Sequence, residues 1–303
     1  MDAGHGHVPA RGHAGAAHRW RLRVAFVLVA VFFVVELVAG LLAGSLALVS
    51  DAGHMAADVV ALGAALVATR VALRPDSTGR RTFGSYRAEV FASGLAVLLM
   101  LGVSVFIVVE AVGRVGHDPE VAGGTMLVVG ALGLVVNVVS LLLLRGGASE
   151  SLNVKGAYLE VVADAVGSVG VIVAGALVAV TGVPLWDTVI ALAIAVFVAV
   201  RAVLLGREVL AVLAQHAPAG IHPDEAEAVL LDVADVLDVH DLHLWTLTSG
   251  MNVATAHLVC RDGADPARVL GEASAVLRER WSIDHATLQV EPRGSRSCVE
   301  TNW

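Results

Sequence analysis

The stretch SLALVSDAGHMAAD, residues 45–58, places ionisable side chains inside a segment that is otherwise suited to lipid. His54 and Asp58 are four positions apart, which puts both on one face of a helix, one turn apart. A second stretch, NVKGAYLEVVADAVGS at residues 153–168, repeats this spacing with Glu160 and Asp164. An ionisable group near the bilayer centre costs about 3 kcal/mol on insertion scales. The four side chains therefore indicate a functional site.

Two such helix faces turned toward each other supply four nitrogen and oxygen ligands, the number that tetrahedral zinc takes. Carboxylate and imidazole groups must be deprotonated to bind metal, so metal binding releases protons and proton binding releases metal. If the four groups are exposed alternately to each side of a membrane, this competition couples metal movement in one direction to proton movement in the other. We expect Asp58 and Asp164 to be essential ligands, Glu160 to be a ligand and proton carrier, and His54 to help set selectivity.

The composition is that of a membrane protein. Of 303 residues, 57% are hydrophobic and 16% are charged, and the mean hydropathy is +0.78. A soluble domain has about 25% charged residues. A helix that crosses the bilayer needs about 20 apolar residues. Stretches of about this length predict six transmembrane helices, at residues 22–42, 46–69, 88–112, 122–144, 156–180 and 186–206.

Lysine and arginine gather on alternate connections between these helices. They precede the first helix, and they occur between the second and third and between the fourth and fifth. The opposite connections carry only Arg114. The positive-inside rule then places both termini in the cytoplasm, with the protein in the cell (inner) membrane. The basic loop after the second helix is expected to contact lipid headgroups, and no nucleic-acid partner is expected.

We predict four regions along the chain. They are a cytoplasmic tail (1–20), a six-helix transmembrane transport domain (21–207), a cytoplasmic domain (208–292) and a C-terminal tail (293–303). The first tail contains His5, His7, His13 and His18 among glycine and alanine, and this composition predicts disorder. Weak metal scavenging and no function at all are equal alternatives for these histidines.

After Arg207 the apolar runs shorten and acidic residues accumulate, which is typical of a small soluble α/β domain. The expected order is a helix, two strands joined at Ser249 and Gly250, a second helix and a third strand. These elements are expected at residues 222–236, 240–248, 251–260, 265–281 and 285–291. This α-β-β-α-β order predicts a sheet packed on helices, with Leu244 and Trp245 in its core. Cys260 and Cys298 make no case for a disulfide in a cytoplasmic domain.

Four motifs follow one another along the chain. They are residues 45–58, FGSYRAE at 83–89, residues 153–168 and DLHLWTLTSG at 241–250. In content and order they resemble the cation diffusion facilitator family, close to its bacterial zinc exporters. The resemblance covers nearly the whole chain. It implies a homodimeric exporter that moves Zn2+ or a similar ion out of the cytoplasm against protons, with ferredoxin-like cytoplasmic domains at the dimer interface.

The resemblance places the family's transport site on His54, Asp58, Glu160 and Asp164. Position 160 is commonly histidine in the zinc members, so this site offers one imidazole and three carboxylates. Carboxylate oxygens shift preference toward Mn2+ or Co2+, although Zn2+ also accepts aspartate and glutamate. We expect Zn2+ as the substrate, with Co2+, Cd2+ and Mn2+ as alternatives.

A second metal site is expected in the cytoplasmic domain. The resemblance points to His240, His257 and His285, with His222 as an optional addition. In a regular pleat, His240 lies on the face opposite His243. The alternative is that these strand histidines only pack or face water. A metal bound here would bridge or stiffen the dimer and act as a regulatory ligand.

Two other functions compete with transport. A membrane metalloenzyme is disfavoured because the sequence has no His-Glu-x-x-His helix, no Gly-x-Ser-x-Gly elbow and no nucleotide loop, so we expect neither enzymatic activity nor a resident cofactor. A membrane metal sensor that binds without transporting is the main alternative. Glu36, Asp51 and Asn137 are expected inside the membrane, either beside the site or as helix-packing groups.

Overall fold

The computed structural model describes residues 19–72, 80, 82–114, 116–117, 119–148, 152–248 and 250–294. The N-terminal histidines, Ser249 and Cys298 lie outside these residues. The chain forms two compact units. One contains the residues up to Gly63 together with Leu95–Leu204, and the other contains Ala64–Gly94 and the residues from Leu205 onward.

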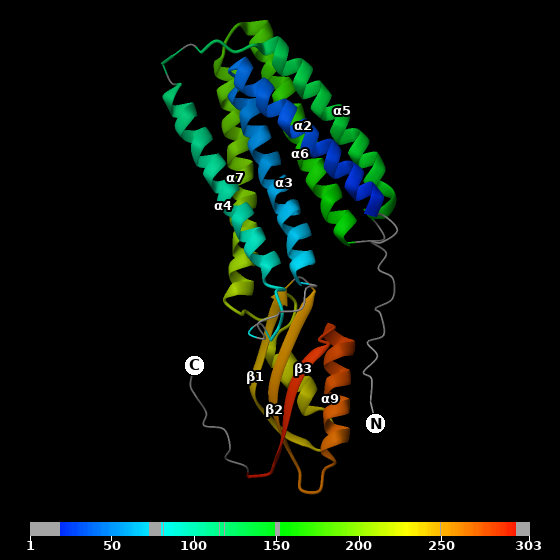
Figure 1. Cartoon of the computed structure of the whole chain (residues 1–303). Helices are drawn as coiled ribbons and strands as arrows, with labels where there is room; N and C mark the ends of the chain where they lie inside the picture. Colours follow the sequence, from blue (N-terminus) through cyan, green and yellow to red (C-terminus); the bar gives the residue numbers. More distant parts are fainter. Residues whose placement is uncertain are drawn as a thin grey trace. The chain divides into compact units, whose positions relative to one another are not determined.

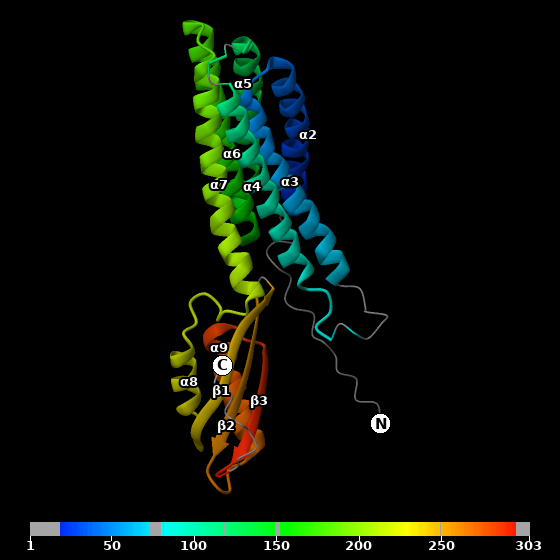
Figure 2. The ribbon, with the colours of Figure 1, turned by 90° about the vertical axis from the view of Figure 1, so that its left-hand side faces the viewer.

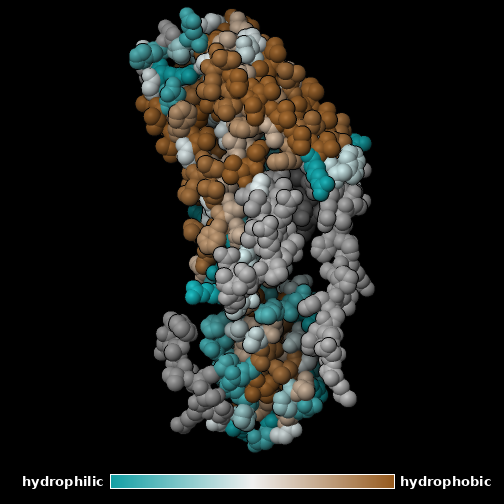
Figure 3. All heavy atoms as spheres, viewed as in Figure 1, coloured by the Kyte–Doolittle hydropathy of each residue, from teal (hydrophilic) through white to brown (hydrophobic). Residues whose placement is uncertain are grey.

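Six long helices fill the first part of the chain, as the sequence predicts (Figure 1). Five of them, all except α3, are long and apolar enough to cross a membrane, by the length and composition of the described residues. Valine, leucine and phenylalanine side chains are exposed on these helices, and Figure 3 shows them as a nearly continuous apolar surface. The six are α2 (Arg19–Ala43), α3 (Leu46–Ala72), α4 (Ala88–Gly113), α5 (Gly123–Ala148), α6 (Leu152–Thr181) and α7 (Leu185–Leu213).

A carboxylate from α7 fixes the start of α3. Asp187 is fully buried and accepts hydrogen bonds from the Ser45 hydroxyl at 2.7 Å and from the backbone amides of Leu46 and Ala47 at 2.7 and 3.0 Å. An Arg114 nitrogen lies 3.4 Å from the same carboxylate. The first amides of a helix lack partners within the helix, and negative charge is favourable there. Asp187 therefore determines where the helix that carries His54 begins.

The turn before α3 requires glycine. Gly44 has a φ of +64°, and a Cβ at this position would lie 2.8 Å from the carbonyl oxygen of Glu120. Both the backbone conformation and the contact exclude a larger residue. The connection between α2 and α3 is thereby held against the segment that precedes α5.

The second unit contains a domain with the predicted α-β-β-α-β order (Figure 2). Its elements are α8 (Pro223–Leu231), β1 (Val236–Thr248), β2 (Met251–Cys260), α9 (Pro266–Trp281) and β3 (His285–Pro292). The predicted helix at 222–236 is too long. It ends at Leu231, and a turn that includes Asp235 in the left-handed region, φ 72°, leads into β1. Val236 is therefore a strand residue, paired with Cys260.

The three strands form a sheet in the order β1-β2-β3, with β1 and β2 antiparallel and β2 and β3 parallel. Helices α8 and α9 contribute to one hydrophobic core with one face of this sheet. Leu244 belongs to that core, whereas Trp245, the next residue, is half-buried and does not. Cys260 is buried in the core; this burial, with a smaller effect from Asp235, raises the pKa of its thiol.

Removing the charge at position 187 should lower the stability of the first compact unit, which is called the helical unit below. We expect Asp187→Asn to destabilise it by roughly 1–3 kcal/mol, because buried donors on α3 and Arg114 lose a charged acceptor. Thermal unfolding in detergent, followed by circular dichroism, measures the change. Glu110→Gln is the control, since Glu110 is 49% exposed and lies 3.6 Å from Arg114. Equal midpoints for the two variants would contradict the role of Asp187.

Candidate metal centres

Three predicted ligands meet inside the helical unit. Nε2 of His54 on α3 lies 3.6 Å from Oδ2 of Asp58 and 3.6 Å from Oδ1 of Asp164 on α6. Two ligands of a tetrahedral zinc ion, each about 2.1 Å from the metal, are about 3.4 Å apart. His54 and Asp164 are 2% and 3% exposed. The spacing and the burial suit a small cation enclosed by protein.

The two carboxylate oxygens of this cluster lack hydrogen-bond partners among the described residues. They are Oδ2 of Asp58 and Oδ1 of Asp164. Buried polar atoms are normally hydrogen-bonded, and buried acceptors without partners are costly. Carboxylate oxygens that lie close together and receive no hydrogen bond need a bound cation or protons to neutralise their charge.

Glu160, the fourth predicted ligand, is not in this cluster. Its carboxylate pairs with the guanidinium of Arg201 on α7. Another nitrogen of Arg201 lies 2.9 Å from Nε2 of His54. Because arginine only donates, Nε2 is the acceptor in this contact and the imidazole proton lies on Nδ1. The structure therefore shows a cluster of three predicted ligands, and Arg201 contacts both His54 in this cluster and Glu160 outside it.

Helix α7 forms a third wall of the site. Phe197 and Arg201 are one turn apart on it. The Phe197 ring meets the His54 ring edge-on at 6.4 Å, and the Arg201 guanidinium lies 5.9 Å from the ring centroid. Sequence reasoning placed the site on α3 and α6 alone. The signal for α7 that the sequence analysis did not use is Arg201, the single basic residue of the predicted span 186–206.

Two further acids lie beside the site. Glu36 on α2 and Asp51 on α3 are 0% and 2% exposed, and among the described residues both Glu36 oxygens and Oδ1 of Asp51 lack hydrogen-bond partners. A Cβ at Gly167 would come within 2.1 Å of Oδ1 of Asp51, so α6 passes close to this carboxylate at a position without a side chain. Glu36 and Asp51 also interact with each other, so they form a buried pair of acids beside the site.

Asn137 on α5 has the packing role. Its Nδ2 donates to Oγ of Ser168 on α6 at 3.2 Å, and both side chains are buried. Hydrogen bonds of this kind hold helices together where water is absent.

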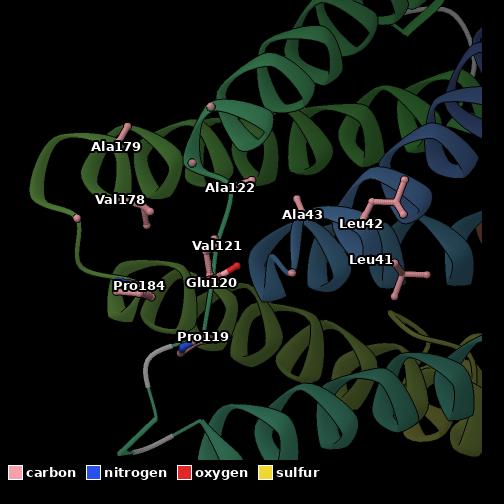
Figure 4. A pocket seen from close by; sticks show the side chains of 14 residues that line it. Leu41, Leu42, Ala43, Pro119, Glu120, Val121, Ala122, Val178, Ala179 and Pro184 are labelled. Carbon is pink, nitrogen blue, oxygen red and sulfur yellow. The ribbon is translucent and has the colours of Figure 1, made fainter.

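An open cavity of about 770 Å³ lies elsewhere in the helical unit (Figure 4). The ends of α2 and α6, the start of α5 and the segment before α5 line it, and Glu120 is the one ionisable residue among the described residues that line it. None of the predicted metal ligands lines this cavity. The candidate transport site is thus a buried cluster separate from it.

A second ligand cluster lies on the sheet of the other unit. His240 on β1 is the register partner of His257 on β2, and the two rings are 5.2 Å apart. Glu291 on β3 joins them: its Oε1 lies 3.0 Å from Nδ1 of His257, and its Oε2 lies 3.7 Å from Nε2 of His240. Each residue offers one ligand atom, and these atoms lie within 4.8 Å of one another. The arrangement suits a divalent metal bound by two imidazoles and one carboxylate.

The other predicted histidines lie apart from this cluster. His285 pairs in register with Val253, four residues from His257 and so about 13 Å along the sheet. Its ring contacts Phe83 at 5.6 Å. His222 precedes α8 and is exposed. The sequence interpretation missed Glu291, although the parallel pairing of β2 and β3 brings it beside His257.

A bulge changes which face His243 occupies. Between His240 and His243 the register shifts by one residue, and Asp241 has a φ of 53°. His243 pairs with Thr255, two residues from His257, and this places it on the same face as His240. The expectation of opposite faces, which assumed a regular pleat, is wrong. His243 contacts Asp241 at 3.2 Å instead of the metal cluster.

Two family models match successive parts of the chain. A family model described as the cation efflux transmembrane domain matches residues 22–214. Another, described as the cytoplasmic domain of cation efflux proteins, matches residues 218–293. A solved structure, the metal-bound C-terminal domain of the CzcD transporter from Cupriavidus metallidurans, is 36% identical. The match covers 23% of this chain and 99% of the chain in that structure, with a TM-score of 0.23.

Curated relatives match almost end to end. The metal cation efflux system protein CzcD of Cupriavidus metallidurans is 41% identical over 96% of this chain and 90% of its own length. A cadmium, cobalt and zinc/H(+)-K(+) antiporter of Bacillus velezensis is 32% identical, with 95% and 92% covered. The zinc transporter ZitB of Escherichia coli is 34% identical, with 89% and 87% covered. The chain is thus a multi-pass membrane protein that belongs to the cation efflux family, the cation diffusion facilitators.

Proposed function

We propose that this protein exports divalent metal cations, Zn2+ first among them, from the cytoplasm in exchange for protons. The observation that carries the proposal is the convergence of His54, Asp58 and Asp164 acceptor atoms inside an apolar helical unit. Relatives named as zinc transporters and as metal/proton antiporters support it. Neither the described residues nor these relatives favour the alternative, a sensor that binds without transporting.

The chemistry of the site supplies the exchange. Carboxylates this close repel one another unless a cation or protons neutralise them. A metal ion that binds must displace protons, and protons that return must displace the metal. Alternate exposure of one site to the two sides is then enough to couple the two flows, and no enzymatic step is needed.

The ligand set favours Zn2+, and Co2+, Cd2+ and Mn2+ remain alternative substrates. One imidazole and carboxylate oxygens at tetrahedral spacing suit Zn2+. The affinity order for divalent ions places Zn2+ above Mn2+ at most such sites. We propose Glu160 as the fourth ligand, once it is released from Arg201.

We also propose that the protein lies in the inner membrane, that both termini are in the cytoplasm and that it is a homodimer. Basic residues on alternate connections support an inner-membrane protein with both termini in the cytoplasm. A homodimer is supported by the sheet face opposite α8 and α9, which carries Trp245 and Val259 as well as His240 and His257. Such partly apolar faces are typical of subunit contacts.

In the cytoplasmic domain we propose a regulatory metal site on His240, His257 and Glu291, in place of a site that includes His285. Metal bound there would join all three strands at the proposed dimer face. It would respond to cytoplasmic metal without being on the transport route.

Transport can be tested in liposomes that contain a pH-sensitive dye. Zn2+ should drive proton flux through the wild-type protein, and Asp58→Asn and Asp164→Asn should each reduce it at least about a hundredfold, a loss of roughly 3 kcal/mol in metal interaction. Asp224→Asn is the matched control, because Asp224 is exposed on α8. Wild-type flux in both site variants would refute the site.

The cytoplasmic site can be tested by counting zinc ions per purified chain with mass spectrometry. Glu291→Gln should lower the count by one, because a buried carboxylate ligand is replaced by a weakly binding amide. His285→Ala should leave the count unchanged. The reverse result would restore the ligand set that the sequence predicted.

A further inference from the structure

Arg201 is a fixed charge in the transport site to which neither the family match nor the metal chemistry assigns a role. It contacts two of the four proposed ligands, with one nitrogen 2.9 Å from His54 Nε2 and another bonded to Glu160. Its side chain is 25% exposed, so it is partly buried beside them. A guanidinium does not lose its proton in proteins, so this charge is permanent.

We propose that Arg201 is a tethered cation that occupies the transport site in place of the metal, and that metal binding requires it to move away. This inference depends on the proposed transport function. In it, Arg201 is a positioning residue: it holds Glu160 apart from the other ligands until a metal competes for them.

The first argument is competition for one lone pair. Nε2 of His54 accepts from Arg201, and the same atom faces Asp58 and Asp164 at 3.6 Å. A metal ion bound by these three residues needs that lone pair. Arginine and metal therefore cannot both engage His54 through Nε2.

The second argument is the charge of the site. Its three carboxylates and Arg201, with neutral His54, have a formal charge of −2, which one divalent ion neutralises. Without Arg201 the same ligands would have a charge of −3. They would attract a divalent ion more strongly, and they would also release it more slowly. A permanent internal cation thus lowers affinity and speeds release.

The third argument is the place prepared for the arginine on its own helix. Phe197 lies one turn before Arg201, with its ring near both the guanidinium and His54. An aromatic face attracts a guanidinium within about 6 Å. The ring gives Arg201 a position beside the ligands that it does not lose when Glu160 is released.

The test is zinc-dependent proton flux in liposomes by the full-length protein and its Arg201→Met variant, which keeps an unbranched apolar side chain without charge. We expect the half-saturating zinc concentration to fall at least about tenfold and the maximal rate to fall with it. Loss of structure alone would lower the rate without tightening binding. Arg201→Lys should stay closer to the wild type, and Arg207→Met is the control, because Arg207 is exposed on the same helix.

A half-saturating concentration that is unchanged or higher in Arg201→Met would overturn the inference. If the variant's flux is too small to fit, zinc retained after desalting decides: one more ion per chain than in the wild type supports the inference, and an equal number overturns it. Arg201→Gln is used if the methionine variant does not elute as a single species. A wild-type protein without zinc-driven flux would instead refute the proposed transport function.

Discussion

This structure depends on one energetic cost. Carboxylate oxygens are buried in an apolar helical unit without hydrogen-bond donors beside them among the described residues. Asp58 and Asp164 lie 3.6 Å from His54 and have ligand oxygens that no hydrogen bond in the described residues satisfies. The surrounding helices keep this arrangement in place. A cation or protons must resolve it, and this requirement links the fold to metal exchange.

Asp187 and Arg201 show two different uses of charge within the same unit. Asp187 receives three hydrogen bonds at the start of α3 and so has a structural role. Arg201 contacts groups that a metal would also bind, and its charge therefore bears on function. Both come from α7, so this helix fixes the position of α3 at one point and the electrostatics of the site at another.

The second cluster, on the three-stranded sheet, also brings acceptor atoms together. Two imidazoles from adjacent strands meet a buried carboxylate from the third strand, so a metal there would tie the sheet together. Its ligands come from elements far apart in sequence. The cluster can form only when the domain is folded, which suits a regulatory site better than a simple metal store.

The sequence by itself determined the six long helices, the order of elements in the second domain and the pairing of His54 with Asp58, because hydropathy and helical spacing are local properties. Only the tertiary structure decided that Glu160 faces Arg201, that Asp187 caps α3 and that Glu291 replaces His285 in the cytoplasmic cluster. Each of these depends on which residues of different elements meet. The bulge at Asp241 belongs with them, because one extra residue in a strand reverses the face of every side chain that follows.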